Sequence, residues 1–573
     1  MASDLVVQFG DILQKPTIFP DEQGKINVVV KNQGDTSVNG PVNLKLYAST
    51  DNQLDTNNLN TLGSPTGERG AKDLLRGTDE LLGSLNGQTV NLAPGQSQTI
   101  TIDFAGSQFR TPSVVSPGAY YLFAQVEPGS NVTDSNSNNN TGSQLITQGD
   151  VVIQWNSILL NTIQASGKGS DPGTPPPLAA RNQAIVHAAI YDAVNSFDRV
   201  NNQGHNPYLV DIKPPAGASK EAAAVGAAYQ TVSQLFTNEN LNRNLSPERR
   251  ASIRDELNRQ RDRSLNEIKD SSAAEQAGFN FGVDIANRII EARKNDGSAT
   301  AQGPYTPGNG IGDWKPTFTD GETTNNDTNL KPAALPQWGS VTPFAIPSAS
   351  QFRPDSFPQY NSPRYAREFN EVKAKGAENS TVRSANETEI AQFWTYDRDD
   401  TFRPSGQLNE VAQELSLAQG KSLSDNARLF ALLNIAQADA GIVAWDAKYT
   451  YEQLRPITAI READKDNNPD TVADPNWEPL LDTPPFPDYI SGHSVFGGAA
   501  AQVLANFFGD NTSFNIPSQE LPGVARSYGS LSQLAQEDAD SRLYGGVHIN
   551  AATVDGVEVG QNVANYVLGN VLK

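Results

Sequence analysis

Two of the four histidines stand in stretches that could bind an oxyanion. The first, His493, follows Ser491 and Gly492 where a loop gives way to the small-residue segment 495–508. Either Ser491 or Ser494 can cap the helix predicted there, and free backbone N–H groups at a helix start bind anions. Glycine lets the backbone approach a ligand, and histidine can exchange a proton near neutral pH. An ordinary capped helix would show the same pattern, so this segment alone does not establish a site.

A second stretch places two cations near a tryptophan. Lys448 lies three residues after Trp445, and Arg455 lies seven residues after Lys448. Residues at these spacings share one face of a helix, which Pro456 should end. The three side chains are therefore expected to project together and to form a wall for an anion. The alternative is a pair of solvated cations with the indole packed inward.

The second histidine, His548, follows a glycine pair, Gly545 and Gly546. These glycines should end a helix, so Arg542 and His548 lie on either side of a bend and could converge on one point. The whole chain is acidic, with a formal net charge of −22, which disfavours binding to nucleic acid or to an anionic membrane. A local cluster of cations and histidines in such a chain predicts a pocket for a highly charged oxyanion, because a buried polyanion needs many charge-assisted donors.

The order and spacing of these motifs resemble a known superfamily. The pattern Lys448-x6-Arg455-Pro456, then Ser491-Gly492-His493, then Ser541-Arg542-x5-His548 is similar to that of vanadium haloperoxidases, bacterial acid phosphatases and lipid phosphate phosphatases. The likeness extends through 181–195 and 390–397 and covers most of 150–573.

The resemblance implies a vanadate cofactor, one per catalytic domain, with His548 as the one protein ligand of the metal. It implies that the vanadate oxygens are held by Lys448, Arg455, Ser491, Gly492 and Arg542. It implies that His493 is the acid–base partner of the apical oxygen. Asp397 resembles an acidic residue that pairs with the arginine at the position of Arg542. By this likeness the catalytic group consists of His493, Lys448, Arg542 and Asp397.

The chain departs from the family pattern at two positions. Ile490 stands where the motif usually has proline before Ser-Gly-His, and Ala552 stands where His-x3-Asp has its aspartate. The carboxylate that would orient His548 through its other ring nitrogen is therefore missing at that position. We expect Asp555 or a backbone carbonyl to replace it.

The predicted pocket fits two reactions, because vanadate and phosphate share charge and shape. In a phosphatase, His548 would form a phosphohistidine and His493 would protonate the leaving group. In a haloperoxidase, the metal would activate hydrogen peroxide for attack by halide. Trp445 and Phe486 resemble aromatic positions that line the halide pocket of the chloroperoxidase branch. We therefore favour a haloperoxidase, with acid phosphatase as the alternative and a non-catalytic adhesion protein as a weaker third.

The favoured activity defines the expected substrates. A haloperoxidase of this kind would oxidise bromide or chloride with hydrogen peroxide to hypohalous acid, which halogenates a small organic acceptor. Halide preference, the acceptor and homo-oligomerisation stay open at this point.

Residues 1–148 are predicted to form a small all-β sandwich. Period-2 or β-branched runs at 5–9, 26–31, 41–48, 98–104 and 119–126 alternate with turn clusters, and the polar stretch 127–149 is taken as the boundary. The pattern resembles the cell-adhesion-related (CARDB-like) domain of bacterial exported proteins, carried by 28–34, 46–51, 92–102 and 119–127. The resemblance implies no catalysis, and leaves open whether the domain is a passive spacer or binds a surface or partner.

Residues 149–573 are predicted to form a large all-α helical bundle. From about 178 the apolar period is 3.6, and helices are expected at 178–196, 217–236, 246–294, 364–375, 386–396, 407–419, 424–454, 492–508, 531–544 and 550–571. The intervening loops 296–363 and 455–490 are long and proline-rich, which is typical of functional loops or of loops that wrap the surface.

Other features of the sequence bear on disulfides, metal sites and localisation. The chain has no cysteine and one methionine, which excludes disulfides and thiolate metal sites. No membrane span is expected, and secretion is favoured although no signal peptide is recognisable and a cytoplasmic location stays open. The acidic stretch 464–470 resembles a calcium loop but lacks its glycine and distal glutamate, so a solvated loop is favoured. His187 is expected in the core, and His205 is given no role.

Overall fold

The structure, a computed structural model, describes residues 2–14, 23–49, 54, 79–105, 119–147, 149–169, 171, 173–239, 245–300, 305–308, 310, 312–316, 332–521 and 524–573. Thr50 and Asp51 of the CARDB-like pattern, the predicted boundary residue 148 and part of the predicted loop 296–363 lie outside these residues. The chain divides into two compact units. One contains Met1–Gly149 with Asn156–Asn161 and Asn515–Arg526, and the other contains Asp150–Trp155, Thr162–Phe514 and Ser527–Lys573.

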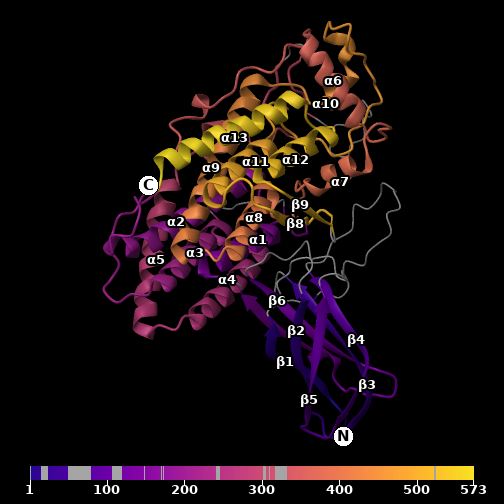
Figure 1. Ribbon diagram of the computed structural model, residues 1–573, viewed down its shortest axis with the longest axis vertical. Coiled ribbons are helices and arrows are strands. Elements are labelled where there is room, and N and C mark those ends of the chain that lie inside the picture. The colour runs from indigo at the N-terminus through magenta and orange to yellow at the C-terminus, as the bar shows by residue number, and fades with distance from the viewer. Residues whose placement is uncertain are drawn as a thin grey trace. The chain divides into compact units, whose positions relative to one another are not determined.

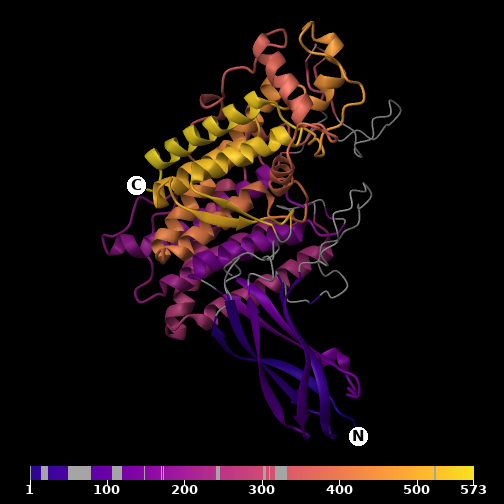
Figure 2. The ribbon, with the colours of Figure 1, turned by 45° about the vertical axis from the view of Figure 1, so that its right-hand side comes forward.

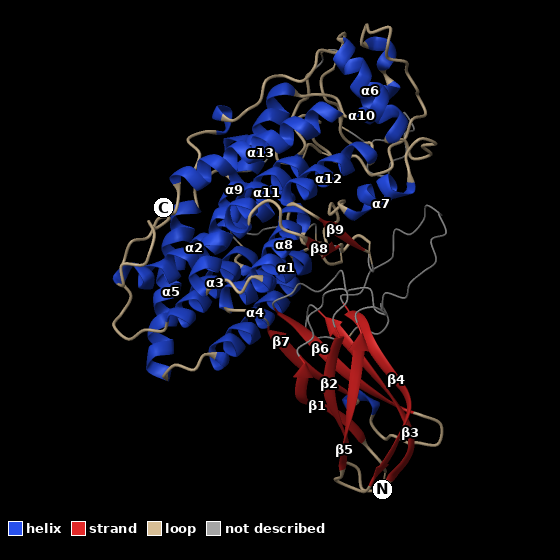
Figure 3. Ribbon diagram, viewed as in Figure 1, coloured by secondary structure: helices blue, strands red, loops and turns tan. Residues whose placement is uncertain are grey.

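The first unit contains two antiparallel sheets (Figure 3). One has the order β1-β2-β5 and the other the order β4-β3-β6-β7. Their strands are β1 (Leu5–Gln14), β2 (Gln23–Asn32), β3 (Val38–Ser49), β4 (Asp79–Leu92), β5 (Ser97–Ala105), β6 (Ala119–Pro128) and β7 (Thr141–Thr147). All five predicted strands are confirmed. The prediction was wrong in omitting β4 and in assigning the residues of β7 to a linker.

The alternation of inward and outward side chains along the strands explains the hydrophobic core of the first unit. Successive inward positions of β2 and β3 are fully buried, namely Ile26, Val28 and Val30, and Val42, Leu44 and Leu46. Side chains two residues apart point to the same face of a strand, so each sheet presents one apolar face. Both faces contribute to a single hydrophobic cluster.

The second unit is helical, as predicted. Its helices are α1 (Val151–Ser166), α2 (Pro176–Val200), α3 (Lys220–Thr237), α4 (Pro247–Glu267), α5 (Ser272–Arg293), α6 (Pro363–Lys375), α7 (Ala385–Phe393), α8 (Arg403–Ala418), α9 (Leu423–Tyr451), α10 (Pro456–Arg461), α11 (Gly492–Phe508), α12 (Leu531–Tyr544) and α13 (Asn550–Asn570). The single helix expected at 246–294 is two helices, because Ser271 caps a new one by accepting from Ala274 N. The sequence also missed α1, α10 and the strand pair β8 (Phe514–Pro517) and β9 (Ala525–Tyr528).

Helices α9, α11, α12 and α13 pack side by side (Figures 1 and 2). The first three carry half of the candidate site residues, namely Trp445, Lys448, Gly492, His493 and Arg542. Among the described helices, α9 alone is long and apolar enough to cross a membrane by length and composition. However, 94% of its most apolar window is buried inside the fold. That burial is typical of the core helix of a helical domain.

Helices α3 and α5 approach each other closely through glycines. A Cβ atom on Gly282 would clash with the Ala223 carbonyl oxygen, and one on Gly226 would clash with that of Phe279. Backbone atoms cannot move aside as flexible side-chain ends can. The packing of this helix pair therefore depends on the absence of a side chain at Gly226 and Gly282.

Two buried aspartates fasten irregular segments to the helices. Asp192 on α2 accepts hydrogen bonds from the backbone N–H groups of residues 208–210, at 2.6 to 2.9 Å. Asp439 on α9 accepts in the same way from residues 344–346, at 2.6 to 2.9 Å. Each carboxylate thereby satisfies three consecutive donors that have no helix or sheet to bond to. These loop segments are tied to the core and do not depend on regular secondary structure for their position.

Candidate oxyanion-binding site

The N-terminus of α11 is built as the sequence predicts. Ser491 is the capping residue, because its hydroxyl accepts from Ser494 N at 3.3 Å. A Cβ atom on Gly492 would lie 3.5 Å from the Trp445 ring, so this backbone is close to α9. His493 is in the first turn and is 7% exposed. The helix start therefore brings a hydroxyl, a backbone N–H and an imidazole into one buried place.

Lys448 and Arg455 meet, but not for the reason that the sequence suggested. Helix α9 ends at Tyr451, Glu452 has a left-handed φ of 48°, and Arg455 is the capping position of α10. The two cations are therefore not on one helical face. Both instead lie over the Phe486 ring, with Lys448 Nζ at 4.9 Å and Arg455 Cζ at 4.8 Å from its centroid. The sharp change of direction after α9 brings them together.

The Lys448 ammonium is held by the loop that precedes α11. Its Nζ donates to the carbonyl oxygens of Pro487 at 2.8 Å and Asp488 at 2.9 Å. Burial, with the neighbouring Arg455, lowers the pKa of Lys448 well below its ordinary value, while the Asp488 charge opposes this. Two acceptors leave one of its three N–H groups available.

The carboxylate beside His548 is Asp488, so the prediction of Asp555 or a backbone carbonyl was wrong. Asp488 Oδ1 lies directly against His548 Nδ1, and both side chains are buried. Asp555 instead accepts from the Tyr489 hydroxyl at 2.7 Å. Burial raises the pKa of Asp488 to about 7, opposed by Arg455 and Lys448. The family spacing places the carboxylate after His548, whereas this fold supplies it from the loop before α11.

The other nitrogen of His548 faces a guanidinium. Arg455 Nη1 lies 3.1 Å from His548 Nε2. Because a guanidinium can only donate, the network assigns a lone pair to Nε2 and the ring hydrogen to Nδ1 beside Asp488. Burial, together with Arg455 and Lys448, lowers the pKa of His548 well below its ordinary value. His548 is thus a neutral imidazole with Nε2 able to bind a metal or attack an electrophile.

Arg542 on α12 completes the cation cluster. Its Nη2 donates to Asp397 Oδ2 at 2.8 Å, which is the expected arginine–carboxylate pair. Burial alone would raise the pKa of Asp397, but Arg542 and His493 outweigh it and hold that pKa below its ordinary value. Asp397 therefore stays ionised and fixes one edge of the guanidinium.

His493 is held by a backbone carbonyl. Its Nε2 lies 2.9 Å from the Thr395 oxygen. A carbonyl can only accept, so Nε2 carries the hydrogen and Nδ1 carries the lone pair. Burial, followed by the charge of Arg542, lowers the pKa of His493 to about 3, whereas Asp397 acts to raise it. The imidazole is therefore neutral and can accept a proton at Nδ1.

The remaining guanidinium nitrogens fit an added anion. Arg455 Nη2 and both Arg542 Nε and Nη1 are buried and find no hydrogen-bond acceptor in the described part of the chain. Unpartnered buried donors are costly, above all when charged. An oxyanion bound at His548 would supply acceptors to them. The donor set thus fits a polyanion with several oxygens.

Two buried carboxyl groups were not identified from the sequence. Asp488 could have been suspected, because it stands three residues before Ser491 of the Ser491-Gly492-His493 motif. Asp538 lies one helical turn before Arg542 on α12, and burial raises its pKa to about 7 against the charge of Arg542. Its position four residues before Arg542 gives no local signal that it is buried.

A metal site of another kind is not indicated. Across the residues that the structure describes, no group of three or more histidine, aspartate or glutamate side chains could hold a metal ion. In the acidic loop 464–470, Asp466 accepts from Asn468 N at 2.8 Å and from Thr471 Oγ1 at 2.7 Å, and Asn468 donates to the Tyr360 carbonyl.

Comparisons with known proteins agree with this geometry. The family described as the vanadium chloroperoxidase N-terminal domain matches residues 147–326, the VCPO second helical-bundle domain matches 428–573, and CARDB matches 2–144. A vanadium chloroperoxidase of Curvularia inaequalis is 27% identical over 483 residues, which are 69% of this chain and 78% of that protein.

Solved structures agree as well. The crystal structure of a bacterial vanadium-dependent iodoperoxidase is 27% identical, with a TM-score of 0.59, and covers 74% of this chain and 96% of its own. A holo-type bacterial vanadium-dependent chloroperoxidase, 16% identical, shares the fold with a TM-score of 0.55 over 71% of this chain and 94% of its own. The chain therefore belongs to the vanadium haloperoxidase family and carries a CARDB domain at residues 2–144.

Proposed function

We propose that this protein is a vanadate-dependent haloperoxidase that oxidises bromide or chloride with hydrogen peroxide to hypohalous acid. The observation that carries the proposal is the His548 Nε2 lone pair beside buried guanidinium donors that lack acceptors. Vanadate supplies, when bound, a Lewis acid that activates peroxide for attack by halide. His548 would hold the metal through Nε2. Lys448, Arg455, Arg542, Ser491 and the Gly492 N–H would hold its oxygens.

The surrounding residues orient these groups. Asp488 Oδ1 lies against His548 Nδ1, which favours the tautomer with a lone pair on Nε2, and outer-sphere carboxylates orient metal-bound histidines in the same way. Asp397 holds Arg542 by one edge and leaves the other nitrogens for the oxyanion. The donors are thus arranged before the anion arrives, which reduces the cost of reorganisation.

His493 is the proposed acid–base group. The Thr395 carbonyl fixes its tautomer, so Nδ1 can take a proton from incoming peroxide and later return it. Burial and Arg542 keep its pKa low, so the imidazole is neutral and only weakly basic before an anion binds. The negative charge of a bound oxyanion would raise that pKa toward the working range.

The aromatic pair formed by Trp445 and Phe486 suits a weakly hydrated halide. The rings of Trp445 and Phe486 lie 5.0 Å apart at 50°, and Lys448 Nζ lies 5.9 Å from the Trp445 ring. The indole Nε1 donates to the Ala334 carbonyl at 3.2 Å, which fixes the ring. An apolar surface beside a cation favours large halides over water. The pair therefore favours the peroxidase over the phosphatase.

Acid phosphatase activity is the second candidate, and one observation favours it. The lone pair on His548 Nε2 could attack a phosphate ester as readily as it could bind a metal. His493 would then protonate the leaving oxygen. The donors that fit vanadate fit phosphate equally well.

The test compares both activities on one full-length preparation. Metal-stripped protein would be assayed with orthovanadate for oxidation of bromide, chloride and iodide by peroxide, and separately for hydrolysis of p-nitrophenyl phosphate. We expect halide oxidation to appear only with vanadate and to be inhibited by phosphate. Turnover of the phosphate ester with no vanadate-dependent halide oxidation would establish the alternative.

A further inference from the structure

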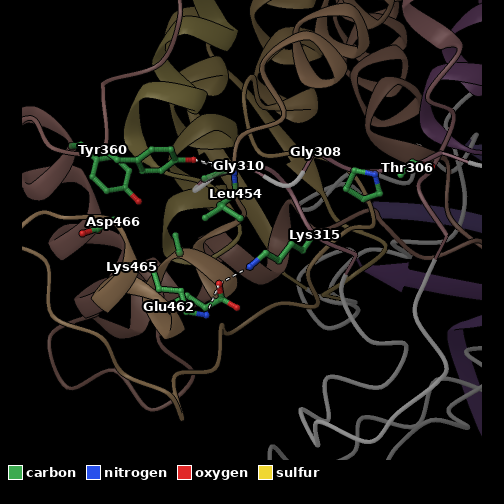
Figure 4. Close-up of a pocket in the computed structure, with 13 residues that line it drawn as sticks. Thr306, Gly308, Gly310, Lys315, Tyr360, Leu454, Glu462, Lys465 and Asp466 are labelled. Carbon is green, nitrogen blue, oxygen red and sulfur yellow. Dashed lines mark hydrogen bonds and ion pairs between the residues drawn. The ribbon is translucent and has the colours of Figure 1, made fainter.

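A cavity lies close to the anion site, within the helical unit. It has a volume of about 530 Å³ and is lined by Tyr360 and Tyr365, by residues between Leu454 and Asp466, and by six described residues of the preceding loop, namely Thr306, Pro307, Gly308, Gly310, Gly312 and Lys315 (Figure 4). Small-molecule sites typically occupy about 300–1,000 Å³. The cavity is thus large enough for a small organic ligand, and neither proposed reaction uses it.

The walls of this cleft are tied together by the backbone. The Gly312 carbonyl accepts from the Tyr360 hydroxyl at 2.8 Å and from Leu454 N at 3.2 Å. Gly312 has a φ of +99°, and a Cβ atom there would clash with the Tyr360 ring. Trp314 N donates to the Glu452 carbonyl at 2.6 Å. Gly312 and Trp314 are therefore held against the segment that follows α9.

The mouth of the cleft carries two ammonium groups that share one carboxylate oxygen. Glu462 Oε2 lies 2.5 Å from Lys315 Nζ and 3.2 Å from Lys465 Nζ, and the two lysines converge on it in Figure 4. Asp466 also lines the cleft, but its oxygens accept from Asn468 N and Thr471 Oγ1. A ligand carboxylate could therefore bond to both lysines by sharing or replacing Glu462, without competing for the donors that Asp466 already holds.

The interior is aromatic and holds one available hydroxyl. The rings of Tyr360 and Tyr365 pack edge to face with centroids 4.8 Å apart, and Leu454 and Ala459 add apolar surface. Tyr365 is 2% exposed, and its hydroxyl has no hydrogen bond to any residue that the structure describes. A buried tyrosine hydroxyl usually has a partner. The Tyr365 hydroxyl faces the cleft and could bond to a ligand there.

The cleft and the anion site share a wall. Leu454 lines the cleft, and the next residue, Arg455, faces His548. Burial raises the pKa of both Tyr360 and Tyr365, and the charge of Asp488 adds to this increase. Asp488 itself touches His548. One extended segment thus separates the two sites.

We propose that this cleft binds a small aromatic carboxylate, with its carboxylate on Lys315 and Lys465 and its ring beside Tyr360 and Tyr365. Resting on the proposed function, this molecule is the organic acceptor. Hypohalous acid from the neighbouring site would form a carbon–halogen bond at the ring, the C–H bond would break, and the ring proton would leave with the hydroxide of the hypohalous acid as water.

Binding is tested without vanadate or peroxide. Fluorine NMR would follow 4-fluorobenzoate added to the full-length protein, with 4-fluorobenzamide as the uncharged comparison. We expect the benzoate to bind and the amide to bind much more weakly. Because the lysines are half exposed, Lys315→Gln and Lys465→Gln should each weaken binding roughly two- to fivefold.

Matched variants identify the site. Lys294 pairs with Glu291 at the same three-residue spacing as Lys465 with Glu462 but does not line the cleft, so Lys294→Gln should leave binding unchanged. Tyr365→Phe should weaken displacement by 4-hydroxybenzoate and leave 4-fluorobenzoate unaffected. Equal binding of benzoate and benzamide, or equal losses in the Lys294 and Lys465 variants, would overturn the assignment.

The acceptor role has its own test. Vanadate-loaded protein would brominate an equimolar mixture of 4-hydroxybenzoate and 4-hydroxybenzamide, beside reagent hypobromous acid on the same mixture. We expect the protein to favour the carboxylate more than the reagent does, and Lys465→Gln to return the ratio to that of the reagent. A reagent-like ratio with wild-type protein overturns the acceptor role alone. Absence of any bromination refutes the proposed peroxidase, while the binding result stands on its own.

Discussion

The His548 imidazole lies between a carboxylate and a guanidinium, and each partner has a different effect. Asp488 at Nδ1 selects the tautomer, and Arg455 places Nη1 at Nε2 while its Nη2 finds no acceptor among the described residues. Neither contact is evident from the local sequence. Together they leave a neutral nitrogen in a strongly positive pocket, which is the property that an oxyanion metal centre needs.

Removing the Asp488 charge should weaken vanadate binding. Loss of a partner that orients a metal-bound histidine typically costs about 10–100-fold in metal affinity, so we expect Asp488→Asn to fall in that range. Asp555→Asn is the matched control, because Asp555 bonds to Tyr489 and not to His548. Vanadate titration with circular dichroism as a check on folding provides the measurement. Equal losses in the two variants would contradict the role given to Asp488.

The two site histidines should differ when replaced. His548→Ala should abolish stable vanadate binding, because it removes the nitrogen that faces the donors. His493→Ala should retain vanadate but lose turnover by roughly 10²–10⁴-fold, as expected for an acid–base group. Metal retention after desalting and bromination of a dye measure the two properties separately. A His548 variant that binds vanadate like wild type would refute the metal-ligand assignment.

The cations and histidines of the site could be predicted from the sequence because each stands in a short motif. Asp488 could not be assigned to His548 in this way, since 60 residues separate them. Lys448 and Arg455 were placed together by a helix that in fact ends between them. Their meeting depends on the left-handed turn at Glu452, and no periodicity rule anticipates such a turn.

At the scale of elements, helix packing depends on small side chains. Gly282→Ala should destabilise the helical unit by about 1–3 kcal/mol, because the new methyl group meets the Ala223 carbonyl oxygen. Gly569→Ala in α13 is the control, since nothing lies within 4 Å of its Cβ position and alanine favours helix. Thermal unfolding of wild type and the two variants provides the measurement. A stable Gly282 variant would mean that α3 and α5 can separate easily.

His187 on α2 makes the free energy of unfolding depend on pH. It is fully buried and stacks on Phe430 of α9 with centroids 5.1 Å apart, and burial lowers its pKa to about 3. Between pH 6.5 and 3 only the unfolded chain takes up this proton, so wild-type stability falls as pH falls. The His187→Leu variant has no imidazole at this position and therefore lacks this pH-dependent contribution to stability. Relative to wild type, its unfolding free energy should therefore rise by roughly 2 kcal/mol from pH 6.5 to 5. If the difference in unfolding free energy between the variant and wild type stays constant from pH 6.5 to 5, the lowered pKa of His187 is contradicted.

Sequence periodicity predicted the elements with clear patterns and missed the others. Strands β2 and β3 alternate cleanly, whereas β4 contains Gly83 and Gly87, which interrupt the pattern. Helix α1 has apolar residues on most of its surface and shows no single apolar stripe. Helix α10 has six residues, and the proline that seemed only to end α9 also begins it. Short or uniformly buried elements lack the contrast on which periodicity depends.

For the whole molecule, each candidate site residue belongs to the helical unit. Residues 150–573 expressed alone should therefore keep their helical circular dichroism and bind vanadate, and they begin with Asp150, which caps α1. Vanadate affinity of this fragment would be compared with that of the full chain. A folded fragment that no longer binds vanadate would show that the CARDB domain contributes to the site. Secretion and a partner-binding role for that domain stay predictions.

The buried carboxylates of Asp192 and Asp439 have a consequence for hydrogen exchange. Each holds three consecutive amide hydrogens of an irregular segment, at residues 208–210 and 344–346. Amide protection follows the free energy of local opening and does not require a helix or strand. These six amides should therefore exchange as slowly as those in the middle of α2 and α9. Rigidity in this protein extends into segments whose sequence alone suggests loose connections.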